Sequence, residues 1–205
     1  ALEVNAAIEE VLQDPTGEQS YRAQFWSDDQ VGLTFSPPAR FVAIADQVYV
    51  LRNVNLEKAA VSFAKLGFAL NDAAVACWHN KYTYNLERPE SFIRRTGINP
   101  NFKLPYLPAT PPFPAYPSCH STFGWAAAMV MENELGSVPS FEDKCHLGRT
   151  EFLSEPRKFN YFSEMARENA RSRIPLGVHF SIDAENGEKL GKRIAAFVNQ
   201  LNWKK

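Results

Sequence analysis

Apolar residues recur at steps of three and four positions in several stretches of the chain. The clearest stretch covers residues 56–80, where one stripe is formed by Ala60, Phe63, Leu66, Leu70, Ala74 and Cys77. This spacing is typical of an amphipathic α-helix that buries one face. The same pattern predicts four more helices, over residues 41–54, 118–135, 161–173 and 183–203. Because no stretch alternates cleanly with a period of two, we expect an all-α fold built as a helical bundle.

Prolines and glycine mark where these helices begin and end. Seven prolines between residues 97 and 117 exclude a helix there and favour a stiff extended loop that leads directly to Ser118. The pair Pro37-Pro38 predicts a break in the chain, and Gly136 is well placed to end the helix that follows the loop. Because there is no internal repeat or linker, residues 1–205 are expected to form a single helical domain.

The composition is that of an ordinary folded domain: of 205 residues, 45% are hydrophobic and 22% are charged. A formal net charge of -1 provides no general attraction to nucleic acid or to acidic membranes. Any anion binding must therefore come from locally placed Arg and Lys side chains. The least charged stretch, residues 104–131, contains six prolines, and we therefore expect no membrane span.

The cysteines and the first residues leave the cellular compartment open. Cys77, Cys119 and Cys145 form no CxxC pair, so neither a disulfide framework nor a thiolate zinc site is expected. The sequence begins at Ala1, without an initiator Met, a basic n-region or an apolar h-region. This start is compatible with a secreted or periplasmic protein after processing, and equally with a piece of a longer precursor.

Groups suited to binding an oxyanion gather in three separate clusters, of which the first is Lys81 with Arg88-Pro89. The two cations are seven residues apart, which is about two helical turns, so both would project from one face if the helix continued toward Pro89. Two cations on one face repel each other unless an anion lies between them. Taken alone, the pair is equally typical of a solvated helix end.

The second cluster, Ser118-Cys119-His120, follows the proline-rich loop and opens an apolar helix. The backbone N–H groups and the positive end of the helix dipole can therefore face an anion there, and Ser118 can add a hydroxyl donor. Taken alone, Ser118 could instead be a simple N-cap and His120 an ordinary residue of the first turn.

The third cluster is Arg173 with His179 and Asp183. Asp183 stands four residues beyond His179, close enough on a helical turn to accept the N–H of the imidazole ring. That contact would select one tautomer and leave the other ring nitrogen as a metal ligand or nucleophile. Taken alone, the pair could equally be a local hydrogen bond.

In this order and with these internal spacings, the three clusters resemble the tripartite signature of the type 2 phosphatidic acid phosphatase and vanadium haloperoxidase superfamily. Residues 111–118 resemble the corresponding loop of fungal chloroperoxidases, and Trp78 stands three residues before Lys81 as the active-site Trp of those enzymes does. The likeness covers about residues 21–191. Whole haloperoxidases are longer at the N-terminus and contain two helical bundles, so the resemblance implies that this chain is the C-terminal, site-bearing half.

The resemblance also implies a cofactor and a reaction. Vanadate, or phosphate in its place, would be bound by His179 as the axial ligand and by five further groups: Lys81, Arg88, Ser118, the N–H of Cys119 and Arg173. His120, Lys81 and His179 would be catalytic, and the surrounding residues would be Asp29, paired with Arg173, and Trp78, Phe113 and Asp183. The implied reaction is the oxidation of iodide, bromide or chloride by hydrogen peroxide, which then halogenates a small organic substrate.

Cys119 departs from the family, which usually has Gly at this position. Its N–H can still bind an oxyanion if its φ angle is negative. A thiol beside an oxidant is nevertheless unusual, because exposed thiolates oxidise readily.

Two other functions stay open from the sequence. In a phosphatase, His179 would attack phosphorus, Asp183 would orient it and His120 would protonate the leaving alcohol. A non-catalytic helical partner is the third reading, although a purely structural protein gains nothing from converging cations. We also expect the chain to pair with the absent N-terminal half or with a second copy of itself.

Overall fold

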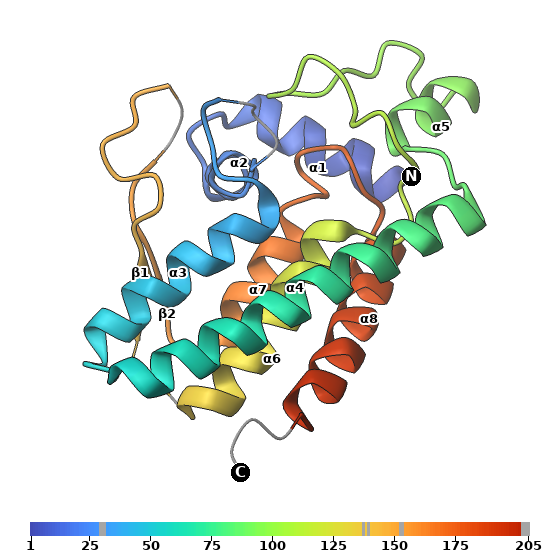
Figure 1. Cartoon of the computed structure of the whole chain (residues 1–205). Coiled ribbons are helices and arrows are strands. Elements are labelled where there is room, and N and C mark those ends of the chain that lie inside the picture. Colours follow the sequence, from blue (N-terminus) through green and yellow to red (C-terminus); the bar gives the residue numbers. More distant parts are fainter. Residues whose placement is uncertain (29–31, 137, 139, 152–153, 202–205) are drawn as a thin grey trace.

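The structure of the chain, a computed structural model, describes all residues except 29–31, 137, 139, 152–153 and 202–205. The elements of the described part are shown in Figure 1. The helices are α1 (Leu2–Gln13), α2 (Glu18–Phe25), α3 (Pro37–Leu51), α4 (Leu56–Tyr84), α5 (Pro89–Arg95), α6 (Cys119–Leu135), α7 (Phe162–Arg171) and α8 (Ser181–Asn199). Two short strands, β1 (Phe141–Asp143) and β2 (Arg157–Phe159), pair antiparallel with Phe141 opposite Phe159. The prediction of an all-α bundle is therefore confirmed.

Helix α6 is the centre of the bundle. Its sequence is apolar on every side from Phe123 to Met131, and nearly all of its residues are buried, as expected of a helix enclosed by others. It packs against α3, α4, α7 and α8. A Cβ atom at Gly187 of α8 would lie 2.6 Å from the carbonyl oxygen of Ser118, so only glycine lets α8 approach the start of α6 this closely.

The five predicted helices are present, with different ends. Helix α3 begins at Pro37 itself rather than after the proline pair, because proline is tolerated in the first helical turn. Helix α6 ends as predicted at Gly136, which has a φ of 68°. Helix α8 ends at Asn199, earlier than the predicted residue 203. The hydrophobic pattern missed three further helices, α1, α2 and α5.

One structural prediction about the site was wrong. Helix α4 ends at Tyr84, and Asn85 follows in the left-handed conformation with a φ of 48°. Arg88 is instead the N-cap of α5. Lys81 and Arg88 therefore do not share a helical face, and the turn at Asn85 brings them together by another route.

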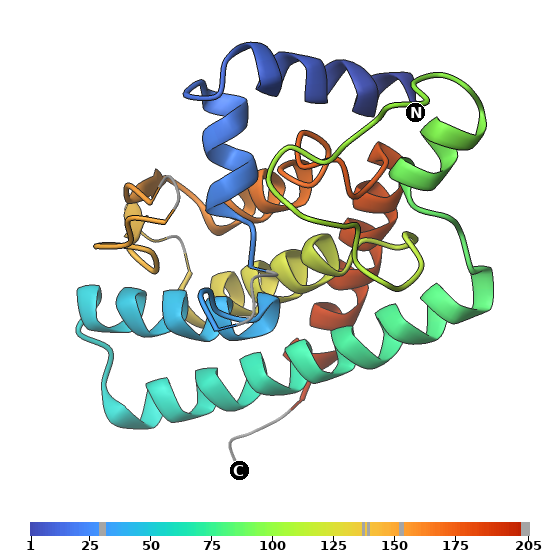
Figure 2. The same cartoon turned by 90° about the horizontal axis from the view of Figure 1, so that it is seen from above.

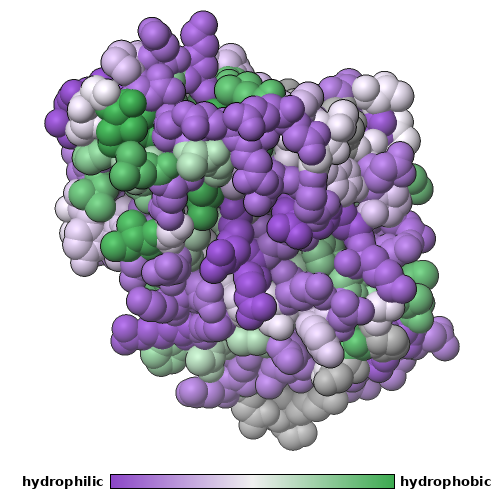
Figure 3. All heavy atoms as spheres, turned by 180° about the vertical axis from the view of Figure 1, so that it is seen from behind, coloured by the Kyte–Doolittle hydropathy of each residue, from purple (hydrophilic) through white to green (hydrophobic). Residues whose placement is uncertain are grey.

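The expectation of no membrane span needs one qualification. By length and composition, the helical stretch Leu56–Arg95 could cross a membrane. However, 39% of the residues in its most apolar part are buried inside the protein. Helix α4, which supplies most of it, packs against α6 and α8. Core helices pass the same test, so the finding is weak evidence for a membrane helix. Figure 3 shows that the face behind that of Figure 1 is largely hydrophilic.

A buried ion cluster joins α3 to the β1 region. Arg40 donates to Asp28 at 2.8 Å and to Asp143 at 2.7 Å, and its guanidinium carbon lies 4.3 Å from the ring centroid of Trp26. His146 lies against the same guanidinium, with 2.6 Å between Nε2 and Nη1. All of these polar side chains are buried. The cluster therefore ties three distant segments together through a charge that is balanced inside the protein.

Candidate active site

The three predicted clusters lie around one cavity. In Figure 2 the yellow-green loop between α5 and α6 passes over the orange segment that joins α7 to α8. Beneath this loop is a cavity of about 380 Å³. Its described lining residues are Ser36, Pro37, Pro38, Ala74, Trp78, Arg88, Pro111, Phe113, Cys119, His120, Phe123, Arg173 and His179. Two arginines and two histidines line it, and none of these residues is acidic.

Lys81 lies behind the cavity wall. Its Nζ donates to the carbonyl oxygens of Pro114 at 2.7 Å, Ala115 at 2.9 Å and Pro117 at 2.8 Å. An ammonium group has three N–H donors, so in this conformation all of them hold the proline-rich loop. Burial is the main cause that lowers the pKa of Lys81. The residue therefore fixes the position of the loop that delivers Ser118 to α6.

Arg88 holds both sides of the cavity. Its Nε donates to the carbonyl of Phe113 at 2.9 Å, and its Nη1 donates to the carbonyl of Val178 at 2.8 Å. The same Nη1 lies 3.1 Å from Nε2 of His179. The guanidinium also lies 5.0 Å from the ring centroid of Phe113. Arg88 thus connects the loop before α6 with the segment before α8.

The predicted contact between His179 and Asp183 is present. Nδ1 of His179 lies 3.1 Å from Oδ2 of Asp183, which also accepts the backbone N–H of Phe180 at 3.0 Å. Because the carboxylate accepts and Arg88 can only donate, Nδ1 carries the proton and Nε2 carries the lone pair. Burial, followed by the charge of Arg88, lowers the pKa of His179 well below its ordinary value. Burial raises the pKa of Asp183 to about 6.

The start of α6 forms the floor of the cavity. Ser118 is its N-cap and accepts from the N–H of Ser121 at 3.4 Å, while its own N–H donates to the carbonyl of Asp183 at 2.9 Å. Cys119 and His120 follow in the first turn, where backbone N–H groups have no carbonyl acceptor earlier in the helix. The φ angle of Cys119 is not positive, so its N–H is placed as that of any first-turn residue.

Arg173 and the aromatic residues complete the enclosure. Arg173 is buried and donates from Nη1 to the carbonyl of Trp26 at 2.8 Å. Its expected partner, Asp29, lies outside the described residues. Trp78 and Phe113 form one wall, with ring centroids 5.3 Å apart. The aromatic pair was expected near a halide, and the structure does place both rings on the cavity.

Sequence reasoning missed part of the wall, namely Ala74, Phe123 and the Pro37-Pro38 pair. For two of these residues the sequence spacing could have indicated their place. Ala74 precedes Trp78 by four residues, and Phe123 follows Cys119 by four, so each shares a helical face with a site residue. The proline pair comes from a distant helix, and no local spacing points to it.

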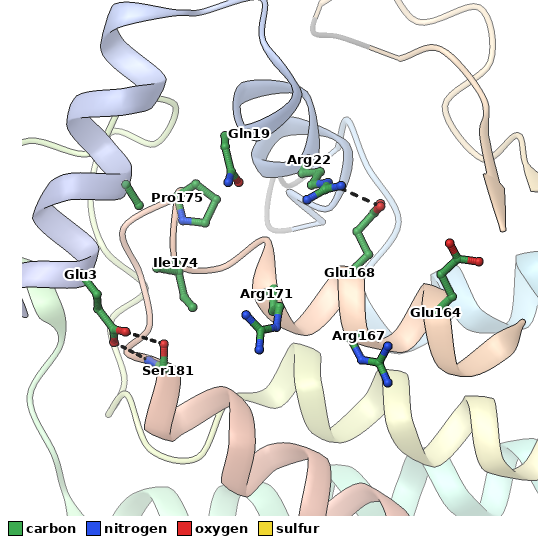
Figure 4. A pocket seen from close by; sticks show the side chains of 11 residues that line it. Glu3, Gln19, Arg22, Glu164, Arg167, Glu168, Arg171, Ile174, Pro175 and Ser181 are labelled. Carbon is green, nitrogen blue, oxygen red and sulfur yellow. Dashed lines mark hydrogen bonds and ion pairs between the residues drawn. The ribbon is translucent and has the colours of Figure 1, made fainter. Parts of the chain in front are cut away.

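A larger hollow lies elsewhere and has different properties. The groove of Figure 4, about 450 Å³, is bordered by α1, α2, α7 and the start of α8. Its lining contains acidic as well as basic residues: Arg22 lies 3.6 Å from Glu168, and Glu3 accepts a hydrogen bond from Ser181 at 2.6 Å. The groove contains none of the predicted site residues. We therefore place the chemistry in the smaller, enclosed cavity.

The donor set around that cavity suits an anionic metal oxide. Among the described residues there is no group of three or more His, Cys, Asp or Glu side chains that could hold a bare cation. Two guanidinium groups, a helix N-terminus and a neutral imidazole are instead the groups that bind a tetrahedral oxyanion and offer it one nitrogen ligand. Vanadate and phosphate both fit this description.

Comparison with known proteins decides the family. A model of the second helical-bundle domain of VCPO, the vanadium chloroperoxidase, matches residues 61–204. The chain belongs to the vanadium haloperoxidase family. A vanadium chloroperoxidase of Curvularia inaequalis is 29% identical, over 81% of this chain and 36% of that protein.

Solved structures of haloperoxidases agree in fold. A bacterial vanadium-dependent iodoperoxidase superposes with a TM-score of 0.89 and 31% identity, over 98% of this chain and 48% of the other. A holo-type bacterial vanadium-dependent chloroperoxidase superposes with a TM-score of 0.69 and 14% identity, which shows the shared fold alone. The chain thus spans about half the length of these haloperoxidase structures, and a smaller share of the curated relative.

Proposed function

We propose that this chain carries the active site of a vanadate-dependent haloperoxidase. The observation that supports this most directly is the neutral His179, whose Nε2 lies 3.1 Å from Arg88 at a cavity that Arg173 and His120 also line. Guanidinium groups beside a neutral imidazole can bind the oxygens of a metal oxyanion and offer it one nitrogen ligand once Arg88 releases that nitrogen. The family relationship supports the same cofactor.

Each residue has a role in this proposal. His179 would bind vanadium through Nε2, and Asp183 would hold the imidazole in the required tautomer. The guanidinium groups of Arg88 and Arg173, the hydroxyl of Ser118 and the N–H of Cys119 would hold the oxygens. Bound vanadate would activate hydrogen peroxide toward attack by a halide. His120 would take up and return the protons of the peroxide.

In this proposal Lys81 holds the loop and also acts on the cavity through its charge. Because its three N–H groups hold loop carbonyls, it would contact an oxyanion only by exchanging one of these bonds. Its charge still acts on the cavity through the protein interior, where electrostatic interactions are weakly screened. Trp78 and Phe113 would limit the entry of water and leave room for a polarisable halide.

The test is an oxidation assay with hydrogen peroxide, first with iodide because it is the most easily oxidised of the three halides, then with bromide and chloride. Activity should depend on added vanadate and disappear in excess phosphate, which competes for the same oxyanion site. Turnover that is unaffected by vanadate would contradict the proposal.

Hydrolysis of a phosphate ester is the competing function, because His179 and Asp183 have the same geometry as a nucleophile and its orienting carboxylate. A phosphate ester should be tested on the same sample. Ester hydrolysis without halide oxidation would assign the chain to the phosphatase chemistry instead.

We also propose that the chain acts together with another polypeptide. Phe68, Val75 and Tyr82 are exposed at seven-residue steps along α4, which is the spacing of an apolar stripe that meets a partner helix. The partner would be the remaining half of a longer haloperoxidase or a second copy of this chain. Sedimentation of the isolated chain as a heat-stable monomer would contradict this.

A further inference from the structure

Two of the three cysteines meet beside the cavity. Cys77 of α4 and Cys119 of α6 are free thiols with their Sγ atoms 2.8 Å apart, although they are 42 residues apart in the chain. Cys119 lines the cavity, whereas Cys77 lies behind it and is fully buried. The residue that departs from the family pattern therefore has a second thiol as its immediate neighbour.

The contact joins two elements that carry the site. Cys77 lies one helical turn before Lys81, and both approach the carbonyl oxygen of Pro117, at 3.6 Å from Sγ and 2.8 Å from Nζ. Cys119 is directly followed by His120. A disulfide needs about 2.05 Å between the sulfurs, so a shift of less than about 1 Å would close this pair.

We propose that Cys77 and Cys119 form a peroxide-responsive pair, which closes to a disulfide and keeps the thiol at the site from irreversible oxidation. The sulfur of Cys119 attacks hydrogen peroxide, the O–O bond breaks, and a sulfenic acid and one water molecule form. The sulfur of Cys77 then attacks that of Cys119, the S–O bond breaks, and a second water molecule leaves. Two thiols and one peroxide thus give one disulfide and two waters.

The surroundings favour this division of roles. Cys119 is the thiol that peroxide meets first, because it lines the cavity. The hydrogen bond from Cys119, helped by the charges of Lys81 and Arg88, lowers the pKa of Cys77. A lowered pKa favours the thiolate that must attack in the second step. Burial, followed by the hydrogen bond with Cys77, raises the pKa of Cys119, so the first step depends on the access that the cavity gives to peroxide and not on the acidity of this thiol. Without Cys77, a sulfenic acid at Cys119 would be exposed to a second peroxide and go on to sulfinic acid.

Cys145 is a natural control for this pair. It lies on the segment after β1 and accepts a hydrogen bond from Gln47 at 3.3 Å, away from the cavity. Burial, followed by the charge of Asp143, raises its pKa. Because Cys145 does not line the cavity, it should stay reduced under conditions that oxidise the pair.

The experiment is treatment of the full chain with hydrogen peroxide, without halide or vanadate, followed by alkylation under denaturing conditions and peptide mass spectrometry. We expect a linked peptide that contains Cys77 and Cys119, alkylation of Cys145 alone, and reversal by dithiothreitol. Sulfinic acid at Cys119 with an alkylated Cys77 would overturn the proposal. So would three unmodified thiols at peroxide concentrations that oxidise a small-molecule thiol.

Variants make the test sharper. In Cys77→Ser, the same treatment should convert Cys119 to sulfinic acid several-fold faster than in the unchanged chain, whereas Cys145→Ser should leave the disulfide yield unchanged. Equal protection of Cys119 in Cys77→Ser would overturn the proposal.

The inference rests on peroxide entering the cavity, which the proposed function also requires. Halide oxidation, measured on the same samples, separates the two. If the disulfide forms but no halide is oxidised, this inference stands and the proposed haloperoxidase function is wrong. If halide is oxidised while Cys119 is converted to sulfinic acid, the proposed function stands and this inference is wrong.

Discussion

Trp26 touches two buried arginines whose surroundings differ. Its ring lies against Arg40, which donates to the carboxylates of Asp28 and Asp143. Its carbonyl accepts from Arg173, which lines a cavity without an acidic residue among the described lining residues. The first arginine is held by two carboxylates inside the protein, whereas the second borders a cavity that an anion could enter.

The comparison also shows which feature is diagnostic. Each region has a buried histidine whose Nε2 lies near an arginine: His146 beside Arg40 and His179 beside Arg88. Burial is the main cause that lowers the pKa of both, for His146 to about 4. A shifted histidine next to an arginine is therefore common to a structural cluster and a candidate site. The cavity is what distinguishes the site.

The largest effect is expected from His179→Ala. His179 is the proposed nitrogen ligand, so the variant should lose measurable vanadate binding in calorimetry and nearly all peroxide-dependent turnover. His79→Ala, an exposed histidine on α4, is the matched control and should behave as the unchanged chain. Unaltered vanadate affinity in His179→Ala would show that this cavity is not the anion site.

His120→Ala should separate binding from turnover. His120 lines the cavity but is expected to move protons, so vanadate should remain bound while turnover falls by about two to four orders of magnitude, the usual scale for a positioned acid–base group. Parallel calorimetry and steady-state rates would measure this. If binding falls as much as the rate, His120 holds the anion rather than the proton.

Replacing one arginine from each region compares carboxylate partners with carbonyl partners. Arg40→Met leaves Asp28 and Asp143 buried without their cation, and the free energy of unfolding should fall by about 3–5 kcal/mol. Arg88→Met removes a side chain that donates to two backbone carbonyls, and the loss of these hydrogen bonds should lower the free energy of unfolding by about 1–3 kcal/mol. Urea denaturation would measure the free energy of unfolding of both variants. An equal decrease in the two would contradict the expected difference between the regions.

A smaller effect should appear in the pH dependence of stability. Because the pKa of Asp183 rises from 3.8 to about 6 on folding, the folded state holds this proton more tightly between those values. Its contribution makes the free energy of unfolding fall as the pH rises, by up to about 1.4 kcal/mol per pH unit. His179, with a lowered pKa, acts in the opposite direction. In Asp183→Asn the free energy should therefore depend more positively on pH than in the unchanged chain.

Urea denaturation at several pH values between 4 and 6 would measure this slope. Asp28, which also has a pKa raised to about 6 by burial, remains in the variant and affects both chains equally. Parallel curves for the two chains would mean that Asp183 keeps its ordinary pKa.

The long helices and the order of the site motifs could be predicted from the sequence because each is a local pattern. The stripe over residues 56–80 needs only its own spacing, and the contact between His179 and Asp183 spans only four residues, although it forms across the N-cap of α8 and not within the helix. The relation of Lys81 to Arg88 could not be predicted in this way, because Asn85 ends the helix by adopting a left-handed conformation. The contacts between Cys77 and Cys119 and between Arg40 and Asp143 join distant segments, and no local period encodes them.

The smallest effect is expected from Arg171→Ala, compared with Arg173→Ala two residues further on. Arg171 is exposed and borders the open groove of Figure 4, where Glu3 and Glu168 supply opposite charges, whereas Arg173 is buried at the enclosed cavity. Solvent and salt screen an exposed charge, so Arg171→Ala should change stability by less than about 0.5 kcal/mol. Its vanadate affinity should stay within about twofold, while Arg173→Ala should weaken binding at least about tenfold. Calorimetry of the two variants would decide between the hollows, and a greater loss from Arg171→Ala would move the anion site to the larger groove.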